Sequence, residues 1–468
     1  MTEKIFLYNT LSRQKDELKP LNREHIKMYT CGLTVYSQPH IGNWVAYIYW
    51  DVLQRVLTAD GYTVERIQNI TDVGHLVSDD DNGEDKMEKG AKAEGVTAWQ
   101  VADKYIAIAD HEAFEMLKLL RPTLVRATDC IAEQIAFVET LETKGYTYEI
   151  PDEGIYFDTS KIKDYGKLAR LDIDGLEAGA RVAVDGKKNP TDFALWKFSP
   201  KDQKRDMEWD SPWGIGFPGW HLECSVIARE NLGDQIDIHT GGIDHIPVHH
   251  TNEIAQTESV TGKAFSQLWV HNNHIKVDGT KMSKSLGNIY TLQDILDKGY
   301  DIQAFKLTIL AKHYRTEGNF TWEILEASQN RLQGYRKMSA LKWQPTDATE
   351  KKGTVYFTKQ QAAILTALND DLNTPQALAV LSEVERDVQA LHTDDVNSFS
   401  DFMAFVDAVL GLSLTVPDIS DGQKAMLQNR AEAKAAKDWG SADRIRDELI
   451  AEGIAINDTS AQQQWYYL

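Results

Sequence analysis

The sequence predicts an α/β protein: a parallel-sheet domain split by an insertion, followed by a helical bundle and a small C-terminal α/β unit. Three observations predict this fold class. Strand-like and helix-like segments alternate between residues 26 and 70. The alternation resumes near residue 219 after a turn-rich stretch, and beyond residue 322 the periodicity is mostly helical.

The first alternating segment has the pattern of a βαβ unit. Residues 26–31 and 62–70 lean toward β-structure, and apolar residues recur at helical spacing over 44–58. A glycine-bearing turn with His40 joins the first strand to the helix. Because a Rossmann-type parallel sheet binds ligands at the carboxyl ends of its strands, we expect a ligand site at this turn.

The remaining segments are recognised by residues typical of turns and helix ends. One helix is predicted over 131–144 within a turn-rich insertion. In the following region, Thr321 is the expected N-cap of one helix and Pro375 suits the first position of another. The last unit has two helical stretches and one short strand. We expect a sheet domain at 1–125 and 213–266, an insertion at 126–212, a loop-bearing region at 267–321, a bundle at 322–417 and a C-terminal unit at 418–468.

Composition excludes several classes of protein. The chain is 42% hydrophobic and 26% charged, as folded globular proteins are. It has no apolar run of about 18 residues and no signal-peptide pattern at its start, so we expect a cytoplasmic protein without membrane contact. The net charge of −21 argues against an extended basic surface, so any RNA contact must be local.

The strongest local motif is KMSKS at residues 281–285, in a loop-like stretch. Its lysines, Lys281 and Lys284, are three residues apart and can both reach phosphate. Lysine ammonium groups offset the negative charge that builds on a leaving phosphate group. The alternative is a solvated surface loop, which the full pentapeptide disfavours.

A second motif, PHIGN at residues 39–43, lies at the strand-to-helix turn. Gly42 lets a ligand approach the backbone, and His40 and Asn43 can each donate a hydrogen bond to a phosphate or ribose oxygen. Taken alone, this short motif is explained as readily by coincidence as by a ligand-binding role.

A third set of residues has the chemistry of metal ligands: Cys31, Cys224, His249 and Glu253. His249 and Glu253 are four apart, which places them on one face of a helix. Two sulfurs, one imidazole and one carboxylate make a four-ligand zinc set. Spacing alone favours the alternative of two buried cysteines and a capped helix. The other cysteine, Cys130, is expected to be buried and inert.

Five further histidines in this half of the chain suggest a larger cluster, but we expect most of them to be hydrogen-bonded or solvated bystanders. They are His221, His245, His250, His271 and His274.

Together, PHIGN and KMSKS resemble the paired HIGH and KMSKS signatures of class I aminoacyl-tRNA synthetases, with Asn43 at the fourth HIGH position. Seven ordered segments resemble the cysteinyl-tRNA synthetase family in particular. They are CGLTVY (31–36), NITDV (69–73), NPTDFALWK (189–197), SPWGIGFPGWHLECS (211–225), DIHTGGIDHIPVHHTNEIAQ (237–256), KMSKSLGN (281–288) and DDLNTP (370–375).

The resemblance implies a split class I catalytic domain with a connective insertion, a stem-contacting region, a tRNA-binding bundle and an anticodon-binding unit. It also implies one zinc ion per chain, held by the four ligands above, that binds the thiolate of L-cysteine. Thr71, Trp220 and His239 would surround the amino acid and Asp244 would lie near the nucleotide. Their alternative roles are a core tryptophan, a satisfied strand-end histidine and a turn-forming aspartate.

The activity implied is ATP-dependent activation of cysteine to cysteinyl-adenylate and transfer to the 3′ end of tRNA(Cys). His40, Gly42 and Asn43 would hold ATP with its Mg²⁺, and the two KMSKS lysines would stabilise pyrophosphate. The family is usually monomeric.

The C-terminal unit offers local candidates for RNA contact. Residues 423–437 hold four basic residues and one acidic residue. By resemblance, Trp439 would stack on an anticodon base and Asp443 would read a base edge, against the alternatives of a packing tryptophan and a solvated acid. The acidic loop at 74–91 departs from the family form and has no assigned role.

Three other functions compete with this one. Some relatives join activated cysteine to an amino sugar in thiol biosynthesis, but they lack an anticodon-type tail. A non-catalytic tRNA-binding protein is supported only by Asn43. Methionine as substrate is disfavoured because a thioether gains little from zinc.

Overall fold

The computed structural model describes residues 4–74, 86–171, 186–201, 204–283, 286–459 and 462–468. At its centre is a five-stranded parallel sheet with the strand order β11-β10-β3-β4-β5. The strands are β3 (His25–Thr30), β4 (Thr63–Ile70), β5 (Thr123–Arg126), β10 (Ile236–Gly242) and β11 (Ser266–Asn272). The predicted parallel sheet is therefore confirmed.

The order of these strands fixes where a ligand binds. Reading from β5 to β11, the strands stand in the chain order 3-2-1-4-5, which is the order of a Rossmann sheet. The order reverses between β3 and β10, whose paired residues include Thr30 and Thr240. Ligands bind in the crevice outside the carboxyl ends of the strands at such a point.

Three helices pack along this sheet and carry its connections. They are α1 (Ile41–Ala59), α5 (Trp220–Leu232) and α6 (His249–Thr261). The predicted helix over 44–58 corresponds to α1, which begins three residues earlier because His40 is its N-cap. Its buried stripe includes Trp44, Ile48 and Val52.

The insertion is a small antiparallel sheet covered by α4 (Ile131–Thr143). The strands, in spatial order, are β6 (Thr147–Ile150), β7 (Gly154–Phe157), β8 (Phe193–Phe198) and β9 (Gly216–Pro218). The last strand lies beyond residue 212 because it pairs with β8. The helix was predicted, whereas the four short strands were not.

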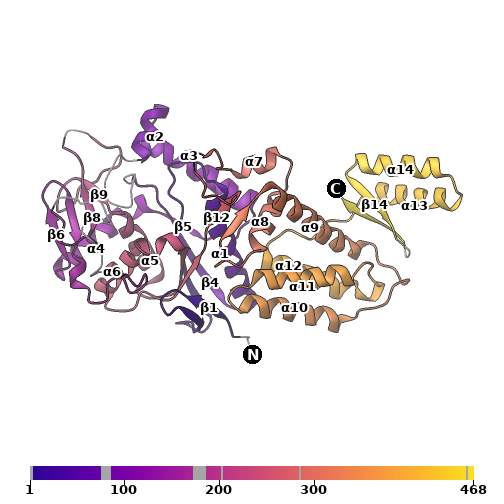
Figure 1. The fold of residues 1–468 in the computed structure, drawn as a ribbon, viewed down its shortest axis with the longest axis horizontal. Coiled ribbons are helices and arrows are strands. Elements are labelled where there is room, and N and C mark those ends of the chain that lie inside the picture. The colour runs from indigo at the N-terminus through magenta and orange to yellow at the C-terminus, as the bar shows by residue number, and fades with distance from the viewer. Residues whose placement is uncertain (1–3, 75–85, 172–185, 202–203, 284–285, 460–461) are drawn as a thin grey trace.

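The chain beyond the sheet forms an elongated arm (Figure 1). The connecting region contains β12 (Ile275–Val277), α7 (Leu292–Asp297), α8 (Ile302–Leu310) and β13 (Gly318–Phe320). The bundle comprises α9 (Trp322–Ala340), α10 (Thr354–Asn369), α11 (Thr374–Asp387) and α12 (Val396–Leu410). The C-terminal unit comprises α13 (Asp421–Ala435), α14 (Trp439–Ala451) and a hairpin of β14 (Ile454–Asp458) and β15 (Gln463–Tyr467).

Two predicted helix starts can be checked in the bundle. Thr321 caps α9 as predicted, since its hydroxyl accepts a hydrogen bond from the Ile324 amide. Pro375 lies at the second position of α11 and Asn373 provides the cap, so the predicted first position is wrong by one residue. Proline is tolerated there because the first-turn amides lack intrahelical partners.

Other elements flank the sheet domain. They are the N-terminal hairpin of β1 (Phe6–Asn9) and β2 (Gln14–Glu17), α2 (Lys86–Glu94), α3 (Ala98–Asp110) and a π-helical segment (His111–Met116). Among the described residues, no helix combines the length and the apolar character that crossing a membrane requires.

A buried ion pair ties α1 to the connecting region and the bundle. The Lys306 ammonium on α8 lies 3.0 Å from Asp51 on α1, and both side chains are fully buried. Arg55 also contacts Asp51 and donates to the Ala408 carbonyl of α12. Burial alone would raise the pKa of Asp51, but the two cations outweigh it and hold this pKa below its ordinary value.

We expect Lys306→Met to lower the free energy of unfolding by about 3 kcal/mol, because removing one partner leaves a buried carboxylate undercompensated. Urea unfolding followed by tryptophan fluorescence measures the change. Lys104→Met is the control, because its pair with Glu94 is exposed and should leave the midpoint unchanged. Equal losses in the two variants would contradict this account.

Candidate functional site

A cavity of about 830 Å³ opens at the switch point of the parallel sheet. Segments that follow β3, β4 and β10 contribute Cys31, Thr71 and Asp244 to its wall. Gly32 must be glycine here, since an added Cβ would lie 1.6 Å from the Asn69 carbonyl oxygen. The close approach of these two loops therefore shapes the floor of the cavity.

At one end of the cavity, the four predicted metal ligands converge. Cys31 follows β3, Cys224 lies on α5, and His249 and Glu253 occupy the first turns of α6. Their ligand atoms all lie within 4.8 Å of one another. His249 Nε2 is 3.4 Å from Cys224 Sγ and 3.2 Å from a Glu253 oxygen. The predicted pairing of His249 and Glu253 on one helix face is confirmed.

A second group of possible ligands overlaps the first and comprises Cys31, His239, His250 and Glu253. His250 was expected to be a bystander, but its Nε2 lies 3.3 Å from Cys31 Sγ. Of the described residues in the second group, only Cys31 lines the cavity, whereas Cys31, Cys224 and His249 of the first group all do. A metal ion held by the first group is therefore the one that a ligand in the cavity can reach.

The histidines of the second group instead contact ligand residues of the first group on the side away from the cavity. His239 is fully buried, and its Nε2 lies 2.8 Å from Glu253 Oε2. The structure thus places His239 against a metal-ligand carboxylate, not on the cavity wall where the amino acid was expected. Hydrogen bonds of this kind fix the orientation of the ligand group.

A hydrogen-bonded chain runs from the N-terminal hairpin to the cluster. Thr10 Oγ1 contacts His271 Nδ1 at 2.7 Å, and His271 Nε2 contacts His250 Nδ1 at 2.7 Å. Burial lowers the pKa of both histidines, so both rings are neutral. His250 and His271 are hydrogen-bonded, as expected of most of the five histidines, whereas Thr10 was not singled out, because it meets them only where β1 packs beside β11.

The chemistry of this pocket calls for a cation. Burial raises the pKa of the Cys31 thiol well above its ordinary value, and it also raises the pKa of Cys224. Thiolates at these positions therefore need a positive charge among them, and a borderline-soft metal ion suits sulfur and imidazole donors. The donor set present thus fits a metal ion.

The PHIGN motif forms the opposite wall of the cavity. His40 is the N-cap of α1, and its Nδ1 accepts a hydrogen bond from the Gly42 amide. Burial lowers the pKa of His40, so the ring is neutral and carries its proton on Nε2. His40 Nε2–H is accordingly available as a donor, and its predicted contact with a phosphate or ribose oxygen stays a prediction.

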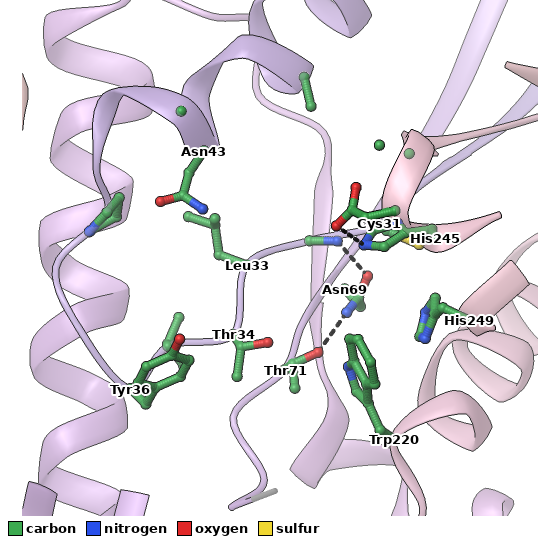
Figure 2. Close-up of a pocket in the computed structure, with 18 of the residues that line it drawn as sticks. Cys31, Leu33, Thr34, Tyr36, Asn43, Asn69, Thr71, Trp220, His245 and His249 are labelled. Atoms are coloured by element: carbon green, nitrogen blue, oxygen red, sulfur yellow. Dashed lines mark hydrogen bonds and ion pairs between the residues drawn. The ribbon is translucent and has the colours of Figure 1, made fainter. Parts of the chain in front are cut away.

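Asn43 has a structural as well as a ligand-facing role. Its Oδ1 accepts a hydrogen bond of 2.9 Å from the His40 amide, which completes a capping box. The Nδ2 amide is the end that can donate to a ligand. Figure 2 shows Asn43 beside Leu33 on the cavity wall, across from Cys31 and His249.

The two signature motifs meet in space. A Cβ on Gly42 would lie 2.3 Å from Met282 Cε, so the KMSKS methionine packs against the glycine of PHIGN. Lys281 lines the same cavity. Lys284 lies outside the described residues, as does most of the acidic loop that has no assigned role.

Thr71 and Trp220, which were predicted to contact the amino acid, also line this cavity. Asn69, which was not singled out, donates from Nδ2 to the Thr71 hydroxyl and accepts from the Gly32 amide (Figure 2). The ring centroids of Trp220 and His249 lie 4.6 Å apart, with the ring planes tilted by 39°. Three of the expected bystanders, His221, His245 and His274, line the cavity.

Cys130 is buried, as predicted. Burial raises its pKa to about 11, so it remains a thiol near neutral pH and is a poor nucleophile.

The predicted basic footprint at residues 423–437 is wrong in its detail. Arg430 is only 6% exposed and is ion-paired with Asp458, which also pairs with Lys434. Lys424 is neutralised by Asp418. The sequence count of charges could not show these partners, which come from outside the segment.

Trp439 is 58% exposed at the start of α14, and Asp443 accepts a hydrogen bond from Arg446 on the same helix. Both lie in the C-terminal unit, far along the arm from the cavity (Figure 1).

A split Rossmann sheet whose switch point joins PHIGN to KMSKS is the catalytic domain of a class I aminoacyl-tRNA synthetase. Residues 17–330 match the family model of class I (C) tRNA synthetase catalytic domains. Residues 363–415 match the DALR domain, and 416–465 match the cysteinyl-tRNA ligase anticodon binding domain. The chain belongs to the cysteine–tRNA ligase family.

Individual relatives agree with this assignment. The chain is similar to cysteine–tRNA ligase 1 of Burkholderia lata, with 47% identity covering 99% of this chain and 97% of the relative. It is 41% identical to cysteine–tRNA ligase of Novosphingobium aromaticivorans, covering 97% of this chain and 94% of the relative. The amino-sugar alternative finds no support, because these relatives and the anticodon-binding match extend over the arm.

Solved structures show the same fold at low identity. Methionyl-tRNA synthetase of Mycobacterium tuberculosis bound to methionyl-adenylate superposes with a TM-score of 0.59 and 13% identity, covering 86% of this chain and 94% of that chain.

We expect Cys224→Ser to lose most of the bound metal, because a hydroxyl replaces one of two soft donors. Metal content per chain, measured by plasma emission, is the test. Cys130→Ser is the matched control, since Cys130 lies outside the cluster and should leave the metal content unchanged. Retention of full metal in Cys224→Ser would contradict the ligand assignment.

Asn43→Ala and Asn43→Asp separate the two roles of Asn43. Alanine removes the capping-box acceptor, at a cost of about 1 kcal/mol for one hydrogen bond, and it also removes the Nδ2 donor. Aspartate keeps the acceptor and replaces the donor with a charged carboxylate oxygen, so we expect near-normal stability. We expect KM for ATP to rise about tenfold in Asn43→Ala, the equivalent of one hydrogen bond, and further in Asn43→Asp, whose carboxylate also repels phosphate. Normal ATP kinetics in both would exclude the donor role.

Proposed function

We propose that this chain activates L-cysteine with ATP and transfers it to the 3′ end of tRNA(Cys), with zinc as the metal at Cys31, Cys224, His249 and Glu253. The observation that carries the proposal is that this sulfur-containing ligand set opens into the same cavity as PHIGN and KMSKS. A sulfur-selective centre and a nucleotide site in one cavity suit the joining of a thiol amino acid to ATP.

Selection of cysteine over serine needs more than pocket size, because the two substrates differ only by sulfur for oxygen. When bound, zinc supplies a Lewis acid that prefers sulfur ligands over a neutral hydroxyl. Among the protein groups, Thr71 and Trp220 line the same end of the cavity and can contact the amino acid. His239 keeps Glu253 oriented through its buried hydrogen bond.

The nucleotide would lie between the two motifs. His40 Nε2–H and Asn43 Nδ2–H donate to phosphate or ribose oxygens, and Gly42 permits the close approach. Asp244, which also lines the cavity, contributes to the nucleotide end. The attack of the cysteine carboxylate on the α-phosphate needs no protein nucleophile. Positioning of the reactants supplies most of the rate.

Pyrophosphate leaves as negative charge builds on its oxygens. Lys281 and Lys284 stabilise this charge as fixed ammonium groups, and Mg²⁺ accompanies ATP. The packing of Met282 against Gly42 sets the distance between the lysine-bearing loop and the turn that holds ATP.

The arm would carry the recognition of tRNA. Trp439 is exposed where a base can stack on it, and Asp443 lies one turn further along α14. We further propose that the chain divides into the six segments expected from its sequence, that it is a monomer, and that it is located in the cytoplasm.

Purified protein should catalyse ATP–pyrophosphate exchange with cysteine but not with serine or methionine, and Cys224→Ser should abolish it. Lys284→Ala should lower the cysteine-dependent rate about 100-fold, the scale of losing one fixed stabilising group in the transition state. Lys263→Ala is a control, since its ammonium is paired with Asp234 and it does not line the cavity. Exchange with serine at a comparable rate would overturn the role of the metal.

A further inference from the structure

The DDLNTP segment, residues 370–375, forms the turn between α10 and α11, and the activity just described gives it no role. Asp371 and Leu372 both have positive φ values, 64° and 50°. Residues other than glycine rarely adopt this backbone conformation, and a strained turn persists only where surrounding contacts hold it in place. The contacts around Asp371 therefore explain why this turn is stable.

The Asp371 carboxylate is buried and gathers donors from two other parts of the chain. Its Oδ1 accepts hydrogen bonds from the Tyr8 amide at 2.8 Å and from the Tyr314 hydroxyl at 2.5 Å. Its Oδ2 accepts two from the Arg315 guanidinium, at 2.9 and 2.6 Å. The Arg315 guanidinium also lies 4.5 Å from the Tyr8 ring centroid.

These partners belong to the sheet domain and the connecting region, which also meet the bundle where α1 packs on α12 and α8 packs on α9. Tyr8 lies on β1, which packs against β11 of the catalytic sheet. Tyr314 and Arg315 follow α8 in the connecting region. The backbone reinforces the junction, because the Asp371 amide donates to the Phe6 carbonyl. One carboxylate thus joins the bundle to both the sheet domain and the connecting region.

The bundle transmits this orientation to the end of the arm. Arg331 of α9 donates to the Leu378 carbonyl of α11, which ties the two helices together. At the far end, Gln344 exchanges hydrogen bonds with the backbone of Trp465 on β15. The C-terminal unit is therefore held on the bundle, and its place relative to the cavity depends on the junctions that hold the bundle, the Asp371 turn among them.

We propose that Asp371 is a positioning residue for tRNA charging: it fixes the angle of the arm, so that one tRNA reaches the C-terminal unit and the cavity together. This inference rests on the proposed function. A substrate that spans both sites loses affinity when their separation is no longer fixed, whereas ATP and cysteine bind within the cavity alone. Asp371 is not among the described residues that line the cavity.

The preceding residue provides a matched control. Asp370 carries the same charge one position earlier, but its side chain is 58% exposed and forms an ion pair with the exposed Lys15. Exposed pairs of this kind contribute little. Asp370→Asn therefore changes the charge of the turn as Asp371→Asn does, without breaking the junction.

The test compares wild type, Asp370→Asn, Asp371→Asn, Arg315→Gln and the double variant Asp371→Asn/Arg315→Gln. Each is assayed for cysteine-dependent ATP–pyrophosphate exchange and for KM and kcat in charging full-length tRNA(Cys), and its thermal unfolding is recorded. We expect Asp371→Asn to exchange at nearly the wild-type rate and to lose about tenfold in kcat/KM for tRNA, mainly through KM. Asp370→Asn should match wild type.

The double variant should be no worse than the poorer single variant, because both substitutions break the same junction. Charging by Asp371→Asn at the wild-type kcat/KM would overturn the proposal. A parallel loss of exchange and charging would also overturn it, since it would show a general defect of the catalytic domain. Failure of wild type to exchange with cysteine would instead refute the proposed function itself.

Discussion

The parallel pairing of β3 with β10 is the constraint on which the rest of the molecule depends. The two strands belong to halves of the sheet that the insertion separates in the chain, and their pairing creates the switch point. Cys31 at the end of β3 then faces α6, which follows β10 and carries His249 and Glu253. Without this pairing the ligand set and the cavity would not exist.

The site joins two electrostatic environments that suit different halves of a substrate. At the metal end, thiols whose pKa is raised by burial and a buried carboxylate require a cation. At the other end, neutral His40 and the amide of Asn43 offer hydrogen-bond donors next to the lysine-bearing loop. Under the proposed function, a thiol and a polyphosphate would be received at opposite ends of one cavity, with the reacting carboxylate and α-phosphate between them.

How far the sequence could predict this arrangement depends on the range of the interactions. The strand, turn, helix and strand around His40 and the i, i+4 pair of His249 and Glu253 are local patterns, and both are confirmed. The insertion's strands have three to six residues and pair antiparallel, so no periodicity revealed them. The roles of Thr10, His250 and Arg430 depend on partners far along the chain, which spacing cannot supply.

Asn43 shows why a departure from a signature motif is compatible with an intact site. The third residue of α1 must present an acceptor to the His40 amide if a capping box is to form, and the Asn43 carbonyl oxygen does so. The same side chain retains an N–H donor on the other end of its amide. One residue thus fixes the helix start that holds His40 and still offers a donor to the cavity. In the proposed nucleotide complex, the substitution therefore changes which atom approaches the nucleotide and keeps a hydrogen-bond donor at that position.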